Sequence, residues 1–272
     1  MSARVGAART AVKAAAAAVD QVRRPPPGLV VLVYHRVGRR TGIEVDLPLA
    51  TFRGQIAELA STARVVSLTD GLARLSADDA PLHTIVSVTF DDGTADFADA
   101  ALPVLVEHRV PVTLYVATDF VECARPFPND GVPLTWSALR DAVATGLVDV
   151  GSHTHTHALL DRLPTDRVAD ELDRSVELIG EHAGTRARHF AYPKAVPGSA
   201  GADALVRTRF ESAALAGTRV NRPGADPYRL ARSPLQYADG MRWFRHKAAG
   251  GLAFEDTLRR VLNRGRYAGA TT

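Results

Sequence analysis

Several features that would assign this chain to a familiar class are missing from its sequence. It has a single cysteine, Cys123, so it can form no internal disulfide and holds no cysteine-rich zinc site. Its 33 basic and 30 acidic residues give a net charge of +3 and are mixed in sign along the chain, which indicates neither a nucleic-acid nor a membrane surface. The longest apolar run, at 29–34, is far shorter than the ~20 residues that span a bilayer. No internal repeat, G-x-S-x-G nucleophile motif or glycine-rich phosphate loop is visible.

The N-terminal segment is rich in alanine and ends in three prolines at 25–27. A secretory signal needs an uninterrupted apolar core of ~7–15 residues, whereas Lys13 and Asp20 bracket a short, weakly apolar alanine run here. We therefore expect a surface helix followed by a stiff proline linker. Without an export signal the sequence favours a cytoplasmic protein, with secretion or membrane association as the alternatives.

Strand and helix patterns alternate along the rest of the chain, whose 272 residues suffice for one large α/β domain. The predicted strands are 29–35, 64–68, 83–90, 112–117, 147–152, 189–193 and 211–216. The predicted helices are 51–62, 69–75, 97–109, 135–146 and 165–184, and the third has a new segment starting at Pro103. A further helix is expected between 193 and 211. Two short helices follow residue 235, the second ending near Asn263. The predicted helix ends are Thr69 and Thr135 as N-caps, and Gly146 and Gly184 as C-terminal residues. This alternation favours a parallel sheet wrapped by helices, as either a barrel or an open doubly wound sheet.

Polar residues stand at the ends of several predicted strands. They are His35, Asp91 with Asp92, His153, and Tyr192. In both parallel architectures, functional residues gather at the carboxyl ends of the strands. We therefore expect these side chains around one rim of the sheet.

A histidine pair and an aspartate pair together indicate a metal site. His153 and His157 are four residues apart, a spacing that can direct two imidazoles to one ion, while His155 between them would point elsewhere. Two nitrogens and one carboxylate oxygen leave a position open for water, which is typical of catalytic sites. One of Asp91 and Asp92 can bind the ion, which offsets their repulsion, and the other can act as a general base. The simpler alternatives are solvated loop histidines and an ordinary turn at Asp-Asp-Gly.

Three motifs together resemble the polysaccharide deacetylase family, the carbohydrate esterase group that includes the chitooligosaccharide deacetylases of nodulation. They are TFDDG at 89–93, HTHTH at 153–157 and RHFAYPKA at 188–195. The resemblance covers about 29–235 and implies a single catalytic domain with a distorted (β/α)7 barrel. It also implies a hydrolase that uses one divalent ion, zinc or else nickel or cobalt, to cleave the linear amide of an N-acetylated carbohydrate. We accordingly divide the chain into an alanine- and proline-rich extension (1–28), the catalytic domain (29–250), and a C-terminal helix and tail (251–272).

The resemblance also implies roles for the residues of these motifs. Asp91 matches the catalytic base, and Asp92, His153 and His157 match the three metal ligands. Many members carry their general-acid histidine in a Leu-x-x-His pattern near the C-terminal end, which this chain lacks. The segment VLVYHRVG at 31–38 resembles a branch that deacetylates exopolysaccharides and takes the acid from its first strand, so His35 is assigned that role.

The third motif departs from the family pattern at several positions. Lys194 stands where an aromatic residue often supplies a backbone N–H to the oxyanion, beside Tyr192, and Ala195 replaces the usual glycine. The arginine that often holds the catalytic base is replaced by Ala191, and Arg188 is the candidate substitute. Trp136 is a further candidate for support near the rim, although packing is its simpler role.

Three alternatives to an N-acetyl hydrolase remain. The same site could hydrolyse sugar O-acetyl esters, or the barrel could bind carbohydrate without catalysis. A glycosidase would need two carboxylates ~5–10 Å apart across the glycosidic bond, which neighbouring Asp91 and Asp92 are poorly placed to provide.

Overall fold

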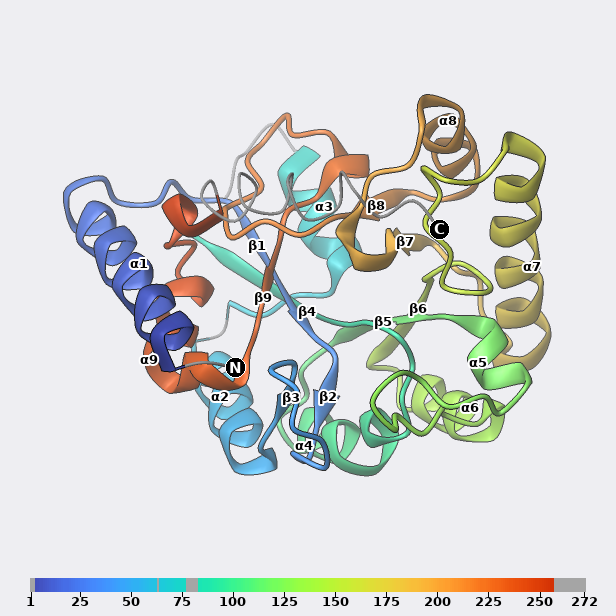
Figure 1. Ribbon diagram of the computed structural model, residues 1–272, viewed down its shortest axis with the longest axis horizontal. Coiled ribbons are helices and arrows are strands. Elements are labelled where there is room, and N and C mark those ends of the chain that lie inside the picture. The colour runs from blue at the N-terminus through green and yellow to red at the C-terminus, as the bar shows by residue number, and fades with distance from the viewer. Residues whose placement is uncertain (1–2, 63, 77–82, 257–272) are drawn as a thin grey trace.

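The computed structural model describes residues 3–62, 64–76 and 83–256, which form a parallel sheet surrounded by helices (Figure 1). The sheet has seven strands in the order β8-β7-β6-β5-β4-β1-β9. Its strands are β1 (Leu29–Tyr34), β4 (Ile85–Phe90), β5 (Val112–Val116), β6 (Val148–Ser152), β7 (His189–Ala191), β8 (Ser212–Ala214) and β9 (Arg232–Pro234). A separate pair joins β2 (Arg36–Val37) to β3 (Asp46–Leu47). Because successive strands lie side by side and run parallel, their carboxyl ends share one edge.

The sheet curls so that its two edge strands approach each other. Ala214 of β8 pairs in parallel with Leu230, just before β9. The Leu215 N–H donates to the Leu230 carbonyl and the Gly217 N–H to the Arg232 carbonyl, both at 2.8 Å. These bonds bring β8 beside β9 and nearly close the barrel. Of the two architectures that the sequence allowed, the distorted seven-stranded barrel is confirmed.

Helices cover the outside of this barrel (Figure 1). They are α1 (Ala3–Val22), α2 (Leu49–Ser61), α3 (Leu68–Ser76), α4 (Leu102–Glu107), α5 (Thr118–Glu122), α6 (Trp136–Ala144), α7 (Thr165–Ala183), α8 (Ala200–Arg209) and α9 (Gly240–Ala248). Alternate residues of each strand face either these helices or the barrel interior. The interior is filled by a cluster that includes Leu29, Val31, Tyr115 and Leu230 and also takes up Leu68 and Leu75 of α3. Helix α3 packs against β1 and β4, and its Thr69 hydroxyl lies 3.0 Å from the Nε2 of His189, the first residue of β7.

Most local predictions from the sequence are confirmed. Thr135 caps α6 by accepting the Ala138 N–H, and Gly146 and Gly184 follow α6 and α7 with φ of 72° and 67°. Helix α4 begins at Leu102, with Pro103 in its first turn, directly after a π-helical turn at Phe97–Ala101. The helix predicted to end near Asn263 lies outside the described residues.

Two local predictions are wrong. The segment 64–68 is not a strand: it makes one parallel bridge, Val65 to Val86, before α3 begins at Leu68. Ser67 rather than Thr69 caps α3 by accepting the Asp70 N–H, because the Thr69 hydroxyl bonds to His189 instead. The seventh strand of the barrel is β9, which the sequence pattern did not predict.

The N-terminal helix packs on the barrel domain through α9, beside which it lies in Figure 1. Ala16 and Ala17 of α1 pack with Trp243 and Leu252, all of them buried. The more unusual contact is ionic, since buried Lys13 and Lys247 both bind the fully buried carboxylate of Asp239. Lys247 also donates to the Pro234 carbonyl at 2.7 Å, which connects this cluster to the end of β9. No helix among the described residues is long and apolar enough to cross a membrane.

Asp239→Ala should lower the free energy of unfolding by ~3–5 kcal/mol, because it leaves two lysines buried without their carboxylate. The measurement is equilibrium unfolding in urea. The matched control is Glu58→Ala, which breaks the exposed pair between α2 and Arg245 of α9 and should cost less than ~1 kcal/mol. Equal losses in the two variants would show that burial of this cluster contributes nothing.

Candidate active site

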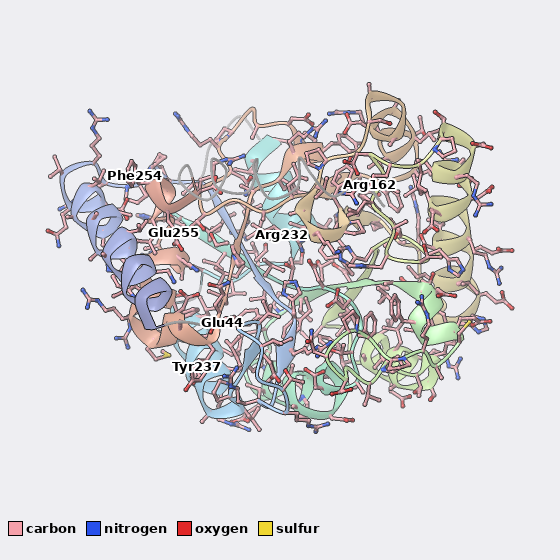
Figure 2. All side chains as sticks on the ribbon, in the orientation of Figure 1. Glu44, Arg162, Arg232, Tyr237, Phe254 and Glu255 are labelled. Carbon is pink, nitrogen blue, oxygen red and sulfur yellow. The ribbon has the colours of Figure 1, made fainter. Side chains whose placement is uncertain are left out.

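A cavity of about 300 Å³ opens at the carboxyl ends of the strands. Its lining comes from β1, β4, β6, β7, β8 and β9 and from the loops that follow them, so the barrel brings together segments far apart in the chain. Figure 2 labels one of these residues, Arg232 on β9, near the middle of the molecule. The lining residues are Val33, His35, Asp91, Asp92, His153, His157, Lys194, Ala195, Ala216, Arg232 and Pro234.

Three of these side chains converge in the way that a metal ion requires. The Asp92 Oδ1 lies 3.7 Å from the His153 Nε2 and 3.6 Å from the His157 Nε2. The three donor atoms all lie within 4.8 Å of one another. Zinc bonds of ~2.0–2.1 Å in tetrahedral geometry would place donor atoms roughly 3.4 Å apart, so the set fits one ion with little adjustment. The sequence named these three residues as ligands, and the fold brings them together.

Hydrogen bonding prepares His153 to face this point. Its Nδ1 lies 2.7 Å from the Ala191 carbonyl, and a carbonyl can only accept, so Nδ1 carries the proton and Nε2 keeps its lone pair for a ligand. Burial, followed by the nearby His153, lowers the pKa of His157 to about 4. The His157 imidazole is therefore neutral at neutral pH, the state in which it can bind a metal.

The other aspartate of the pair faces an arginine. The Asp91 carboxylate accepts two hydrogen bonds from Arg232, at 2.5 and 2.8 Å, and both side chains are almost wholly buried. Arg232 is fixed in turn by donating to the Leu215 carbonyl at 3.1 Å. Burial raises the pKa of Asp91, but the charge and hydrogen bonds of Arg232, together with the nearby His153 and His35, outweigh burial and hold that pKa well below its usual range. Asp91 is thus ionised and held in one orientation, next to the three-donor set.

This pairing corrects one prediction. Arg188 was the candidate for holding the base, but its guanidinium binds Glu211 at the molecular surface. Arg232 was not singled out, although an arginine inside a short apolar segment, between Ala231 and Pro234, is an unusual residue. Its role depends on β9 lying beside β1, a pairing between distant segments that local patterns do not reveal.

His35 lies on the same cavity, as the sequence predicted. Its Nε2 is 3.9 Å from the Asp91 Oδ2, and its side chain is 26% exposed. Its Nδ1 is buried and has no hydrogen-bond partner among the described residues. The ring therefore reaches the cavity without being tied to a structural partner.

The backbone around the cavity is strained at several positions. Asp92, His157 and Lys194 have φ of 78°, 64° and 52°, in the left-handed region that costs non-glycine residues ~1–3 kcal/mol. Asp92 is held in place because its carbonyl accepts the Ala117 N–H from the end of β5. Strain of this kind is typical of sites whose side chains must point in a required direction.

The residues after β7 divide between the cavity and the core. Lys194 and Ala195 line the cavity, and the Ala195 N–H bonds to the Tyr192 carbonyl. The Tyr192 side chain is fully buried and donates to Asp203, so the prediction that it lies on the rim with the other polar side chains is wrong. The oxyanion role of the Lys194 N–H stays a prediction.

Two further candidates lie away from the cavity. Trp136 stacks on His182 at 4.9 Å and donates to Glu122, which makes it a packing residue. His155 points away from the two ligand histidines, as predicted, with its Nδ1 2.9 Å from the Thr118 hydroxyl.

The nearly closed parallel barrel thus brings an Asp-His-His set that could hold one metal ion, together with an adjacent ionised aspartate, to the carboxyl ends of its strands. The model of the polysaccharide deacetylase family matches residues 79–209, just under half of the chain. The match includes the aspartate pair and the histidine loop, whereas β1, with His35, and β9, with Arg232, lie outside it.

Several solved structures share this fold. IcaB from Ammonifex degensii is 27% identical and superposes with a TM-score of 0.72 over 82% of this chain and 98% of that chain. The Streptococcus pyogenes deacetylase PplD, solved in complex with acetate, is 17% identical, with a TM-score of 0.69 over 86% of this chain and 98% of that one. A de-N-acetylase from Aggregatibacter actinomycetemcomitans is 18% identical, with a TM-score of 0.66 over 79% and 99% of the two chains. At these lower identities the last two show the fold alone.

A curated relative matches over a shorter stretch. The Bacillus subtilis protein YlxY is 24% identical over 98 residues, which are 36% of this chain. The match spans only about a quarter of that relative, 27% of its length.

Proposed function

We propose that this protein removes N-acetyl groups from an N-acetylated carbohydrate by metal-dependent hydrolysis. The observation that carries the proposal is the convergence of Asp92, His153 and His157 beside the Asp91–Arg232 pair in one cavity. The Aggregatibacter protein of similar fold is a de-N-acetylase, which favours amide over ester substrates.

The three-donor set would hold one divalent ion, for which zinc is the best fit to two imidazoles and one carboxylate. When bound, such an ion polarises the acetyl carbonyl and makes water more acidic. The partners of the two aspartates fit this chemistry, because Asp91 pairs with Arg232 while Asp92 faces His153 and His157.

Residues of the chain carry out the remaining steps. Asp91 takes a proton from the water that attacks the acetyl carbon, and Arg232 keeps the carboxylate aimed at that water. In this proposal the backbone N–H of Lys194, a residue that lines the cavity, stabilises charge on the acetyl oxygen. As the C–N bond breaks, His35 gives a proton to the departing nitrogen, and the products are acetate and the free amino sugar.

Incubating the purified protein with a panel of N-acetylated and O-acetylated sugars tests this function. We expect acetate release with an equal amount of free amine from at least one N-acetylated sugar. Acetate without amine would instead identify an O-acetyl esterase. No acetate from any sugar, with carbohydrate binding retained, would identify the inactive barrel.

His35→Gln should reduce turnover of an N-acetyl substrate by ~10²-fold or more, within the range for a positioned general acid. Hydrolysis of an activated aryl acetate should suffer far less, because its leaving group needs little protonation. Metal content should stay at the wild-type level. The measurement is the ratio of the two losses in metal-replete protein, and equal losses would argue against His35 as the acid.

A further inference from the structure

The helix α7 carries a glutamate that faces inward. Glu171 is 8% exposed and lies on the buried face of the helix with Val168, Leu172 and Ser175. A carboxylate is almost never buried to this extent without partners, because burial removes it from water. Its partners show what it does.

All the partners of Glu171 lie between the two histidines of the proposed metal site. Its Oε2 accepts the backbone N–H of His155 at 3.0 Å and that of Thr156 at 2.8 Å, and its Oε1 accepts the Thr156 hydroxyl at 2.7 Å. Two successive backbone N–H groups that converge on one oxygen form a concave anion site. Here the anion is supplied by the chain itself.

The loop needs this support because its backbone is unusual. Thr154 and His157 both have φ of 64°, so the segment between the ligand histidines is strained at each end. A second contact comes from the same face of α7, four residues after Glu171. The Ser175 hydroxyl lies 2.6 Å from that of Ser152, which accepts the Thr154 N–H. The polar positions of this buried helix face thus both serve the loop.

We infer that Glu171 is a positioning residue for the metal site: it fixes the 153–157 loop so that His157 faces Asp92 and His153. The hydrogen bonds of the carboxylate go to residues 155 and 156 and not to the three proposed metal-binding atoms. Glu171 therefore acts on the site through the backbone of this loop. This inference rests on the proposed function only in requiring that the Asp92-His153-His157 set binds a metal.

Zinc affinity of the full-length protein, measured by competition with a chromophoric chelator, tests the inference. Glu171→Ala should weaken zinc binding by ~10–100-fold, as is typical when a residue that supports a metal ligand is lost. Glu171→Gln should bind zinc much more tightly than the alanine variant, because its amide oxygen can accept both N–H groups while its NH2 donates to the Thr156 hydroxyl. Glu177→Ala is the matched control: it removes an exposed carboxylate of α7 that pairs with Arg174, and zinc affinity should not change.

Three results would overturn the inference: wild-type affinity in folded Glu171→Ala, a glutamine variant as weak as the alanine variant, or an equal loss in the Glu177 control. If Glu171→Ala does not fold, Thr156→Val decides, since it removes one of the three hydrogen bonds and should weaken zinc binding by a smaller factor. An unchanged affinity in that variant would then contradict the inference. Failure of the wild-type protein to bind zinc would count against the metal site itself and is thereby distinguishable.

Discussion

Asp91→Asn should reduce acetate release by ~10²–10⁴-fold while the protein keeps its metal. An amide cannot take the proton of the attacking water. Asp91 is ionised and lies beside the Asp92-His153-His157 set without belonging to it, so it is free to act as the base. The substitution keeps the size of the side chain, so one amide oxygen can still accept from Arg232. The measurement is the initial rate of acetate release from zinc-loaded protein, with metal content determined on the same sample.

Asp92→Asn is the informative counterpart, because the two aspartates are adjacent but face different partners. It should lower zinc affinity, and its rate should recover in part at high zinc concentration. The Asp91 variant should not recover. The opposite pattern, with recovery for Asp91→Asn alone, would mean that the two roles have been exchanged.

His153→Ala should lose both the metal and the activity. The His153 side chain is 2% exposed and is already oriented by the Ala191 carbonyl, so its replacement removes a prepared donor and leaves two of the three. His157→Ala should do the same, and acetate release should fall to background in each. Metal content of the purified proteins and acetate release together measure the effect.

His155→Ala is the matched control for these two variants. It removes an imidazole from the same loop, but one that bonds to Thr118 rather than facing Asp92. It should keep about one ion per chain. Equal metal loss in all three histidine variants would indicate a damaged loop and not the loss of particular ligands.

The sequence predicted those parts of the site that lie within short motifs. The aspartate pair follows one strand and the histidine pair follows another, and any parallel barrel brings such strand ends to one edge. The roles of Asp91, Asp92 and the histidines came from a resemblance to a family, and the fold gathers these residues as that resemblance requires.

The residues that the sequence missed act across long separations. Arg232 reaches Asp91 because β9 returns to lie beside β1, which no local pattern encodes. The segment 64–68 has the composition of a strand, but it makes only one bridge to β4. Helix α3 then begins at its last residue, Leu68. The sequence does place the carboxylate of Glu171 on the apolar face of an amphipathic helix, which is unusual. Its partners, however, lie in the loop 153–157, and no local pattern shows that contact. Short motifs therefore identified the candidate metal ligands, while pairing between distant segments determined which residues hold them in place.

Titration of metal-free protein with zinc, followed by acetate release from an N-acetylated oligosaccharide that the wild-type protein cleaves, tests the central claim most directly. The chain should be inactive after treatment with a chelator, because Asp91 and His35 alone supply only proton transfer. Activity should return with added zinc and saturate at about one equivalent per chain, as one three-donor set predicts. Full acetate release by the metal-free protein, or zinc binding without any return of activity, would contradict the claim.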